Sequence, residues 1–191
     1  PKLSRRAKPR FTTGEQGVEL DDGSRIKFVA RSSGSGRGFT GDLVILDEAY
    51  NLSDEMMAAM LPTMSARSIT GNPQIWYTSS APHPVAHSDV LRRLCKRGRA
   101  GTSEGLAYFE WCASDADALD DVEAQAKANP ALGIRISEEF VSREFEALGP
   151  DEFARERLGL WSEDDKSHAV IPAVAWAACE DPKSAPTGPL S

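Results

Sequence analysis

The chain has 191 residues, of which 40% are hydrophobic and 27% charged, and its formal net charge at pH 7 is −7. This length suits one well-packed domain, or one domain with an appendage, and no apolar run approaches the roughly 20 residues of a membrane span. The opening PKLSRRAKPR lacks the apolar core of a signal peptide, and three cysteines and three histidines are scattered without metal-ligand spacing. We therefore expect no membrane partner, no disulfide framework and a reducing, cytoplasmic setting.

Charge is unevenly spread along the chain. The first ten residues carry five basic side chains and no acidic one, whereas residues 110–165 carry 16 acidic against 5 basic side chains. Phosphate binding depends on a local basic patch and not on the total charge. The acidic total therefore does not exclude a nucleic-acid partner.

The first half of the chain alternates predicted strands and helices. GVEL and RIKFVA flank the turn-forming DDGS, which predicts a β-hairpin, and a glycine- and serine-rich stretch then leads into the strand LVIL at 43–46. Ser53 is a predicted helix cap, because methionines and a leucine follow it at helical spacing. A strand at 74–80, a basic amphipathic helix at 88–97 and a strand at 105–113 complete the alternation. This order predicts an α/β domain with a largely parallel sheet.

The second half of the chain reads as helical. Three helices are predicted at 117–128, 137–148 and 151–161, and Pro, Gly and Ser then dominate a closing linker.

Two adjacent carboxylates, Asp47 and Glu48, end the strand at 43–46. Open α/β sheets bind ligands beyond the carboxyl ends of their parallel strands. In a P-loop NTPase, the Asp at this place holds the water shell of Mg²⁺ and the following Glu polarises the attacking water. The alternative is that both acids only favour the dipole of the helix that follows.

Two neighbouring features can each be part of a nucleotide site or can have a purely structural role. The strand at 74–80 ends in Thr78, Ser79 and Ser80, whose hydroxyls can sense a γ-phosphate or can simply form a polar strand end. Arg37, in the glycine-rich loop before the Asp-Glu strand, can match phosphate oxygens bidentately or can be a solvated loop arginine.

The order of these motifs, from RGFTGDLVILDEAYNLSDE through QIWYTSSAP to KANPALG and FARERLGLW, resembles the large terminase subunit of tailed double-stranded DNA bacteriophages. The resemblance covers about residues 17–161 and implies a partial P-loop NTPase sheet with flanking helices, RecA-like and of the additional-strand catalytic-glutamate class, followed by a helical lid or linker. It implies these roles: Asp47 as the Walker B metal residue, Glu48 as the catalytic glutamate, Thr78, Ser79 and Ser80 as the coupling motif at the nucleotide, and Arg37 as an arginine finger acting in trans.

The resemblance also implies ligands, partners and boundaries. It implies an ATP hydrolase with ATP and Mg²⁺, acting on double-stranded DNA with the portal protein and the small terminase subunit, in a homo-oligomeric ring. The setting is the cytoplasm of the infected bacterial host, with transient docking on the procapsid portal. The implied domains are 1–116, the C-terminal half of the ATPase domain, 117–178, the helical lid or linker, and 179–191, a linker toward a nuclease domain that is missing here.

One departure from the family pattern is the lack of any G-x-x-x-x-G-K-[ST] in the sequence. We therefore expect a fragment that is inactive on its own. A piece of another P-loop translocase or helicase, or a binding module that handles no nucleotide, stays open as an alternative.

A basic stripe on the helix at 88–97 is the remaining candidate site. Arg92, Arg93, Lys96 and Arg97 lie on one side of this helix by spacing. They can contact DNA, face a neighbouring subunit or form an ordinary solvated face.

Overall fold

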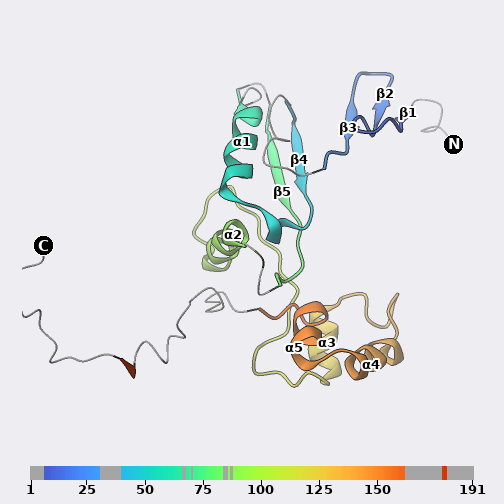
Figure 1. Cartoon of the computed structure of the whole chain (residues 1–191), viewed down its shortest axis with the longest axis vertical. Helices are drawn as coiled ribbons and strands as arrows, with labels where there is room; N and C mark the ends of the chain where they lie inside the picture. Colours follow the sequence, from blue (N-terminus) through green and yellow to red (C-terminus); the bar gives the residue numbers. More distant parts are fainter. Residues whose placement is uncertain are drawn as a thin grey trace, which may run out of the picture. The chain divides into compact units, whose positions relative to one another are not determined.

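The computed structural model describes residues 7–30, 40–65, 68–69, 71–83, 86, 88–161 and 178–179. The chain forms two compact units, whose elements are labelled in Figure 1. The first unit takes in Pro1–Asp47 and Leu52–Thr78, and the second takes in Glu48–Asn51 and Ser79–Ser191. The domain boundaries expected from the sequence stay predictions. Within the described residues, no helix has both the length and the apolar character needed to span a bilayer.

An antiparallel sheet begins the first unit. Its strands, in spatial order, are β1 (Ala7–Arg10), β2 (Gly17–Leu20) and β3 (Arg25–Lys27). Gly23 in the β2–β3 turn has a φ of +86°, which glycine adopts freely because it lacks a Cβ. The predicted hairpin is confirmed. β1 was not predicted, because its short sequence AKPR contains Pro9, which a sheet tolerates at an edge but not in its interior.

Two parallel strands carry the predicted α/β pattern. They are β4 (Leu43–Leu46) and β5 (Gln74–Tyr77), paired so that Leu43 lies opposite Gln74 and Leu46 opposite Tyr77. Both strands were predicted, although β5 ends three residues earlier than expected. The parallel register brings the carboxyl ends of both strands to the same edge.

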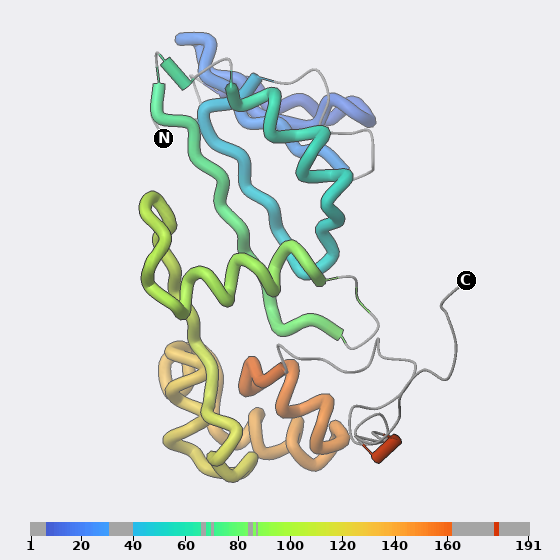
Figure 2. The backbone as a smooth tube through the Cα atoms, turned by 90° about the vertical axis from the view of Figure 1, so that its left-hand side faces the viewer, coloured from blue at the N-terminus to red at the C-terminus, as the bar shows by residue number. Residues whose placement is uncertain are grey.

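Helix α1 (Asp54–Ser65) connects the two strands and lies along one face of the pair in Figures 1 and 2. Ser53 Oγ accepts the N–H of Met56 at 3.2 Å, so the predicted cap is confirmed. Leu46 of β4 and Met60 and Met64 of α1 are buried.

The other face of the β4–β5 pair is apolar and exposed. Leu43, Ile45 and Trp76 are 45%, 56% and 52% exposed, and Ile45 lies opposite Trp76 in the register. Both faces of a parallel sheet are normally packed against other elements. Among the described residues, only the α1 face of the β4–β5 pair is packed in this way.

The second unit contains a short 3₁₀ helix, η1 (Ala49–Asn51), and helix α2 (Asp89–Ala100). A segment without helix or strand, residues 106–113, follows α2, and Tyr108 from this segment packs against Gly98. A Cβ on Gly98 would come within 2.3 Å of the Tyr108 ring, so the contact requires glycine. The strand predicted at 105–113 is wrong, because these residues form no β-strand and no described strand pairs with them.

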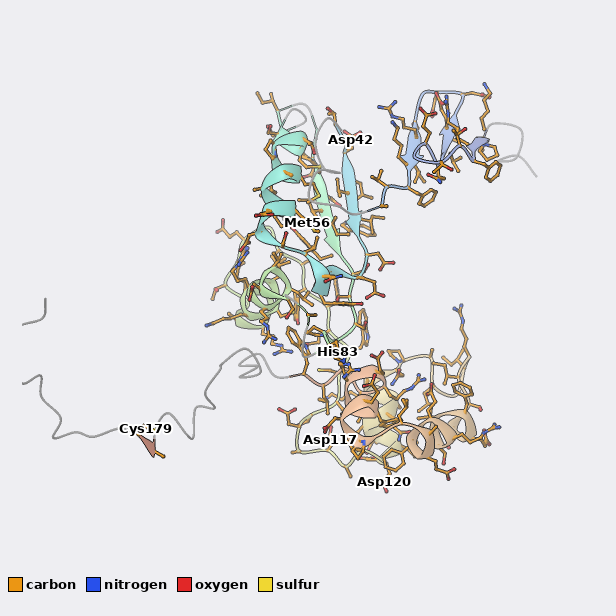
Figure 3. The ribbon with its side chains drawn as sticks, viewed as in Figure 1. Asp42, Met56, His83, Asp117, Asp120 and Cys179 are labelled. Atoms are coloured by element: carbon orange, nitrogen blue, oxygen red, sulfur yellow. The ribbon has the colours of Figure 1, made fainter. Side chains whose placement is uncertain are left out.

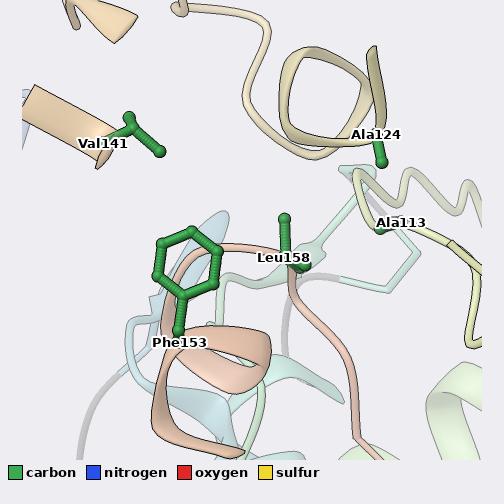
Figure 4. Packing of buried hydrophobic residues seen from close by; sticks show 5 residues of the cluster. All are labelled: Ala113, Ala124, Val141, Phe153 and Leu158. Carbon is green, nitrogen blue, oxygen red and sulfur yellow. The ribbon is translucent and has the colours of Figure 1, made fainter. Parts of the chain in front are cut away.

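Three helices complete the second unit: α3 (Val122–Ala128), α4 (Glu138–Ala147) and α5 (Pro150–Glu156). Their core, shown in Figure 4, consists of Ala113, Ala124, Val141, Phe153 and Leu158. The side chains of Asp121 and Ser137 accept backbone N–H groups and so cap α3 and α4. All three helices were predicted. The cap at Asp121 explains why α3 begins later than expected, and α5 ends at Glu156, five residues before its predicted end. Together the strands and helices confirm the α/β class.

Candidate functional site

The carboxylate of Asp47 and the hydroxyl of Thr78 meet at the common end of β4 and β5. Thr78 N–H donates to the Leu46 carbonyl at 3.1 Å, which continues the parallel ladder one residue past β5. Thr78 Oγ1 then donates to Asp47 Oδ1 at 2.8 Å. Both side chains belong to exposed residues. The structure thus brings together two residues that the sequence placed at the same sheet edge.

The next hydroxyl, that of Ser79, binds a different part of the chain. Ser79 Oγ accepts the N–H of Tyr50 at 3.1 Å and donates to the Ser80 carbonyl at 2.8 Å. Tyr50 lies in η1, which begins directly after Glu48. The Thr78 hydroxyl therefore binds Asp47, and the next hydroxyl, of Ser79, binds the backbone just after Glu48. The sequence contained no signal for Tyr50, because it takes part through its backbone.

Glu48 has a left-handed backbone, with a φ of +51°. No other non-glycine residue in the described part of the chain has a positive φ. Such a conformation costs a side-chain-bearing residue about 1–2 kcal/mol and recurs at functional sites. The turn is held on its far side by Asn51, whose N–H donates to the Glu48 carbonyl at 3.1 Å, and by Ala49, which is fully buried.

The oxygen ligands at this edge fit a shared magnesium ion. Mg²⁺ prefers hard oxygen ligands and is commonly held by one or two carboxylates together with substrate phosphates. Asp47 supplies such a carboxylate, and the Thr78 hydroxyl orients it. Among the described residues, no cluster of three or more His, Cys, Asp and Glu side chains is able to hold a metal ion by itself.

The other two predicted site residues are Ser80 and Arg37. Ser80 is exposed and takes part through its carbonyl, which accepts the Ser79 hydroxyl. Arg37 lies outside the described residues.

The basic stripe on α2 is partly engaged within the second unit. The Arg92 guanidinium lies 5.3 Å from the centre of the Trp161 ring, within cation–π range. Arg97 Nε donates to a serine hydroxyl in the loop after the helix at 3.1 Å. Arg93 and Lys96 are exposed. A contact between this stripe and DNA stays a prediction.

A polar cluster fastens the segment 106–113 to α2. Arg99 Nε donates to Glu110 at 2.9 Å, and this hydrogen bond lowers the pKa of the Glu110 carboxyl. Burial raises the pKa of the Tyr108 hydroxyl and of the Cys112 thiol above their ordinary values. Both groups therefore stay protonated at neutral pH, and Cys112 is not an activated nucleophile. The cluster has a structural role.

Two parallel strands joined by a helix, with a carboxylate and a hydroxyl at their common carboxyl end, form a small α/β unit. No protein-family model and no curated protein matches the sequence. Among solved structures, the chain is similar to the one titled "Crystal structure of the HK97 bacteriophage large terminase", with a TM-score of 0.64 and 19% sequence identity. The alignment covers 84% of this chain and 34% of that one, so the chain spans about a third of the length of that terminase. The resemblance drawn from the motifs is thus confirmed at the level of the fold.

Proposed function

We propose that this chain is part of the large subunit of a phage terminase, the ATP-driven motor that moves viral double-stranded DNA into the procapsid. The hydrogen bond from Thr78 to Asp47, at the carboxyl ends of two parallel strands, is the observation that carries the proposal. The fold shared with the HK97 large terminase supports it.

Each residue at this edge has a separate task in the proposal. Asp47 would be the residue that holds the magnesium ion of ATP, and the metal would supply neutralisation of phosphate charge. Thr78 keeps the Asp47 carboxylate in one orientation through its 2.8 Å hydrogen bond. Glu48 accepts a hydrogen bond from the attacking water and polarises it.

In the proposal, the consecutive hydroxyls of Thr78 and Ser79 couple hydrolysis to movement. Thr78 is bonded to the metal residue and Ser79 to the η1 backbone, and the two are consecutive in the chain. A shift of the chain at Thr78 when the γ-phosphate leaves is therefore passed to the segment that follows Glu48. In the proposal this is the work of a coupling motif.

Other parts of the motor lie outside these observations. In the proposal another part of the motor supplies the phosphate-binding loop, whose G-x-x-x-x-G-K-[ST] pattern does not occur in these 191 residues. Arg37 reaches the nucleotide of the next subunit as an arginine finger. The partners in the proposal are double-stranded DNA, the portal protein and the small terminase subunit, and the motor acts in the host cytoplasm while docked on the portal.

The test is steady-state ATP hydrolysis by the complete protein that supplies the phosphate-binding loop. Glu48→Gln keeps the shape of the side chain but cannot polarise water as a carboxylate does, so turnover should fall about 10²- to 10⁴-fold while ATP affinity is kept. Glu55→Gln, at an exposed acid in the first turn of α1, is the matched control and should leave turnover unchanged. Turnover by Glu48→Gln within a few-fold of the unmodified protein would refute the assignment.

A further inference from the structure

The antiparallel sheet of β1, β2 and β3 is not used by the proposed ATPase chemistry. Side chains extend from both of its faces (Figure 3), and the pairing register separates them by chemistry. One face carries the apolar side chains of the three strands, which are Ala7, Pro9, Val18, Leu20 and Ile26. The other face, here called the basic face, carries all of their charged side chains, which are Lys8, Arg10, Glu19, Arg25 and Lys27.

A row of two cations with a gap between them crosses the basic face. Arg10 of β1 and Lys27 of β3 lie on either side of Gly17 in the register. A Cβ on Gly17 would lie 2.3 Å from the Ile26 carbonyl oxygen, so the close approach of β2 to β3 requires glycine. The centre of this row therefore has no side chain, and the two cations flank open backbone.

Glu19 lies among the cations of the basic face. Its carboxylate accepts the Nε–H of Arg10 at 3.0 Å, and this hydrogen bond lowers the pKa of the Glu19 carboxyl. The positive charges of Arg25 and Lys8 lower it further. Lys8 also forms an ion pair with Asp21 at 3.4 Å, in which both side chains are mostly exposed. Such exposed pairs contribute little stability, so their cations can exchange onto a phosphate.

The basic face has the charge and the dimensions of a phosphate-binding surface. Its four basic residues are all exposed, and Glu19 is the one acidic residue on this face within the described strands. The other described acids of this part of the chain, Glu15, Asp21 and Asp22, lie in the turns. Alternate residues of a strand are about 6.6 Å apart, and the two outer strands are about 10 Å apart. Phosphates of one DNA strand advance by about 3.4 Å along the axis, so the face can reach about two or three of them.

We propose that the basic face is a contact surface for the phosphate backbone of double-stranded DNA. Arg10 and Lys27 hold one phosphate between them above Gly17, and Arg25 contacts a neighbouring phosphate. Lysine and arginine contacts to phosphates carry no sequence information, which suits a motor that moves DNA of any sequence. The inference rests on the proposed function for the identity of the polyanion. It requires no nucleotide, because it uses none of the residues around Asp47.

Fluorescence anisotropy of a labelled DNA duplex, titrated with the full chain in the absence of nucleotide, tests the inference. The Arg25→Gln/Lys27→Gln variant should weaken binding about tenfold and should reduce the slope of log affinity against log salt by about 1–2, because each lost phosphate contact reduces it by about 1. The matched control is Lys127→Gln/Arg135→Gln, which removes one lysine and one arginine from exposed positions of the second unit. It should leave the affinity and the slope unchanged.

Glu19→Gln supplies a readout that loss of folding cannot imitate. This change removes the one acid of the basic face, so it should tighten DNA binding about threefold and make the salt dependence steeper. The matched control is Glu146→Gln, at an exposed acid of α4, which changes the net charge equally and should not tighten binding.

Three results would overturn the inference: no saturable binding of the duplex by the unmodified chain at low salt, equal losses in the Arg25→Gln/Lys27→Gln variant and its control, or tighter binding of the single strand than of the duplex. None of these results alters the ATP turnover expected for Glu48→Gln. Conversely, unchanged turnover in Glu48→Gln would refute the catalytic assignment and leave the DNA contact standing.

Discussion

Glu48 has a left-handed backbone, which is strained for any residue with a side chain. We therefore expect that glutamate at position 48 lowers the stability of the fold while serving the proposed function. A side-chain-bearing residue in this region costs about 1–2 kcal/mol relative to its usual backbone, and glycine avoids that strain. Glycine also gains about 0.5–1 kcal/mol of extra freedom in the unfolded chain, which offsets part of the gain. Replacing alanine by glycine at position 48 should therefore stabilise the fold by about 0.5–1 kcal/mol.

The comparison is between Glu48→Gly and Glu48→Ala, because both variants lack every interaction of the glutamate side chain. For a chain of this size, about 1 kcal/mol corresponds to about 2–4 °C in the melting temperature. Thermal melts followed by circular dichroism should place Glu48→Gly about 1–4 °C above Glu48→Ala.

The matched control is Ala58→Gly in the exposed interior of α1, where the same chemical change should lower the melting temperature, because glycine costs about 1 kcal/mol in a helix. A Glu48→Gly variant that melts at or below Glu48→Ala would show that position 48 is not strained.

Two further predictions concern contacts seen in the structure. Gly98→Ala should destabilise the second unit by about 1–3 kcal/mol, because the new Cβ would lie 2.3 Å from the Tyr108 ring, and a lower melting temperature would report it. Thr78→Val should lower ATP turnover of the complete protein about 10- to 100-fold, because it removes the donor that orients Asp47 while preserving the shape of the side chain.

Each of these two predictions has its own control. Gly149→Ala introduces a Cβ into open space at the start of α5, so a loss of stability equal to that of Gly98→Ala would contradict the steric explanation. Thr63→Val in α1 removes a hydroxyl that bonds only to the Met60 carbonyl within its own helix, at 2.6 Å. Turnover that is unaffected by Thr78→Val, or is lowered equally by Thr63→Val, would remove Thr78 from the site.

Much of the local structure was predictable because short-range physics determines it. The apolar runs at 43–46 and 74–77 form strands, and Ser53 caps α1, since each depends on residues adjacent in sequence. The meeting of Asp47 with Thr78 was also predictable, because parallel strands bring their carboxyl ends to one edge.

Other features depend on tertiary partners that no local pattern encodes. The positive φ of Glu48 follows from the way its neighbours are held, and the bond from Tyr50 to Ser79 uses a backbone N–H that every residue possesses. The segment 105–113 has the composition of a strand, yet pairing requires a partner strand, and none is present in the described part of the chain.

The magnesium dependence of ATP binding tests the central claim, that Asp47 is the metal residue and Glu48 the catalytic one. In the complete protein, binding of a fluorescent ATP analogue is measured over a series of Mg²⁺ concentrations for the Asp47→Asn and Glu48→Gln variants. The account predicts that Asp47→Asn needs about 10- to 100-fold more Mg²⁺ for half-maximal binding, as loss of an outer-shell carboxylate does, and that Glu48→Gln is unchanged. Equal magnesium requirements in both variants and the unmodified protein would contradict it, and both acids would then serve only the turn between β4 and α1.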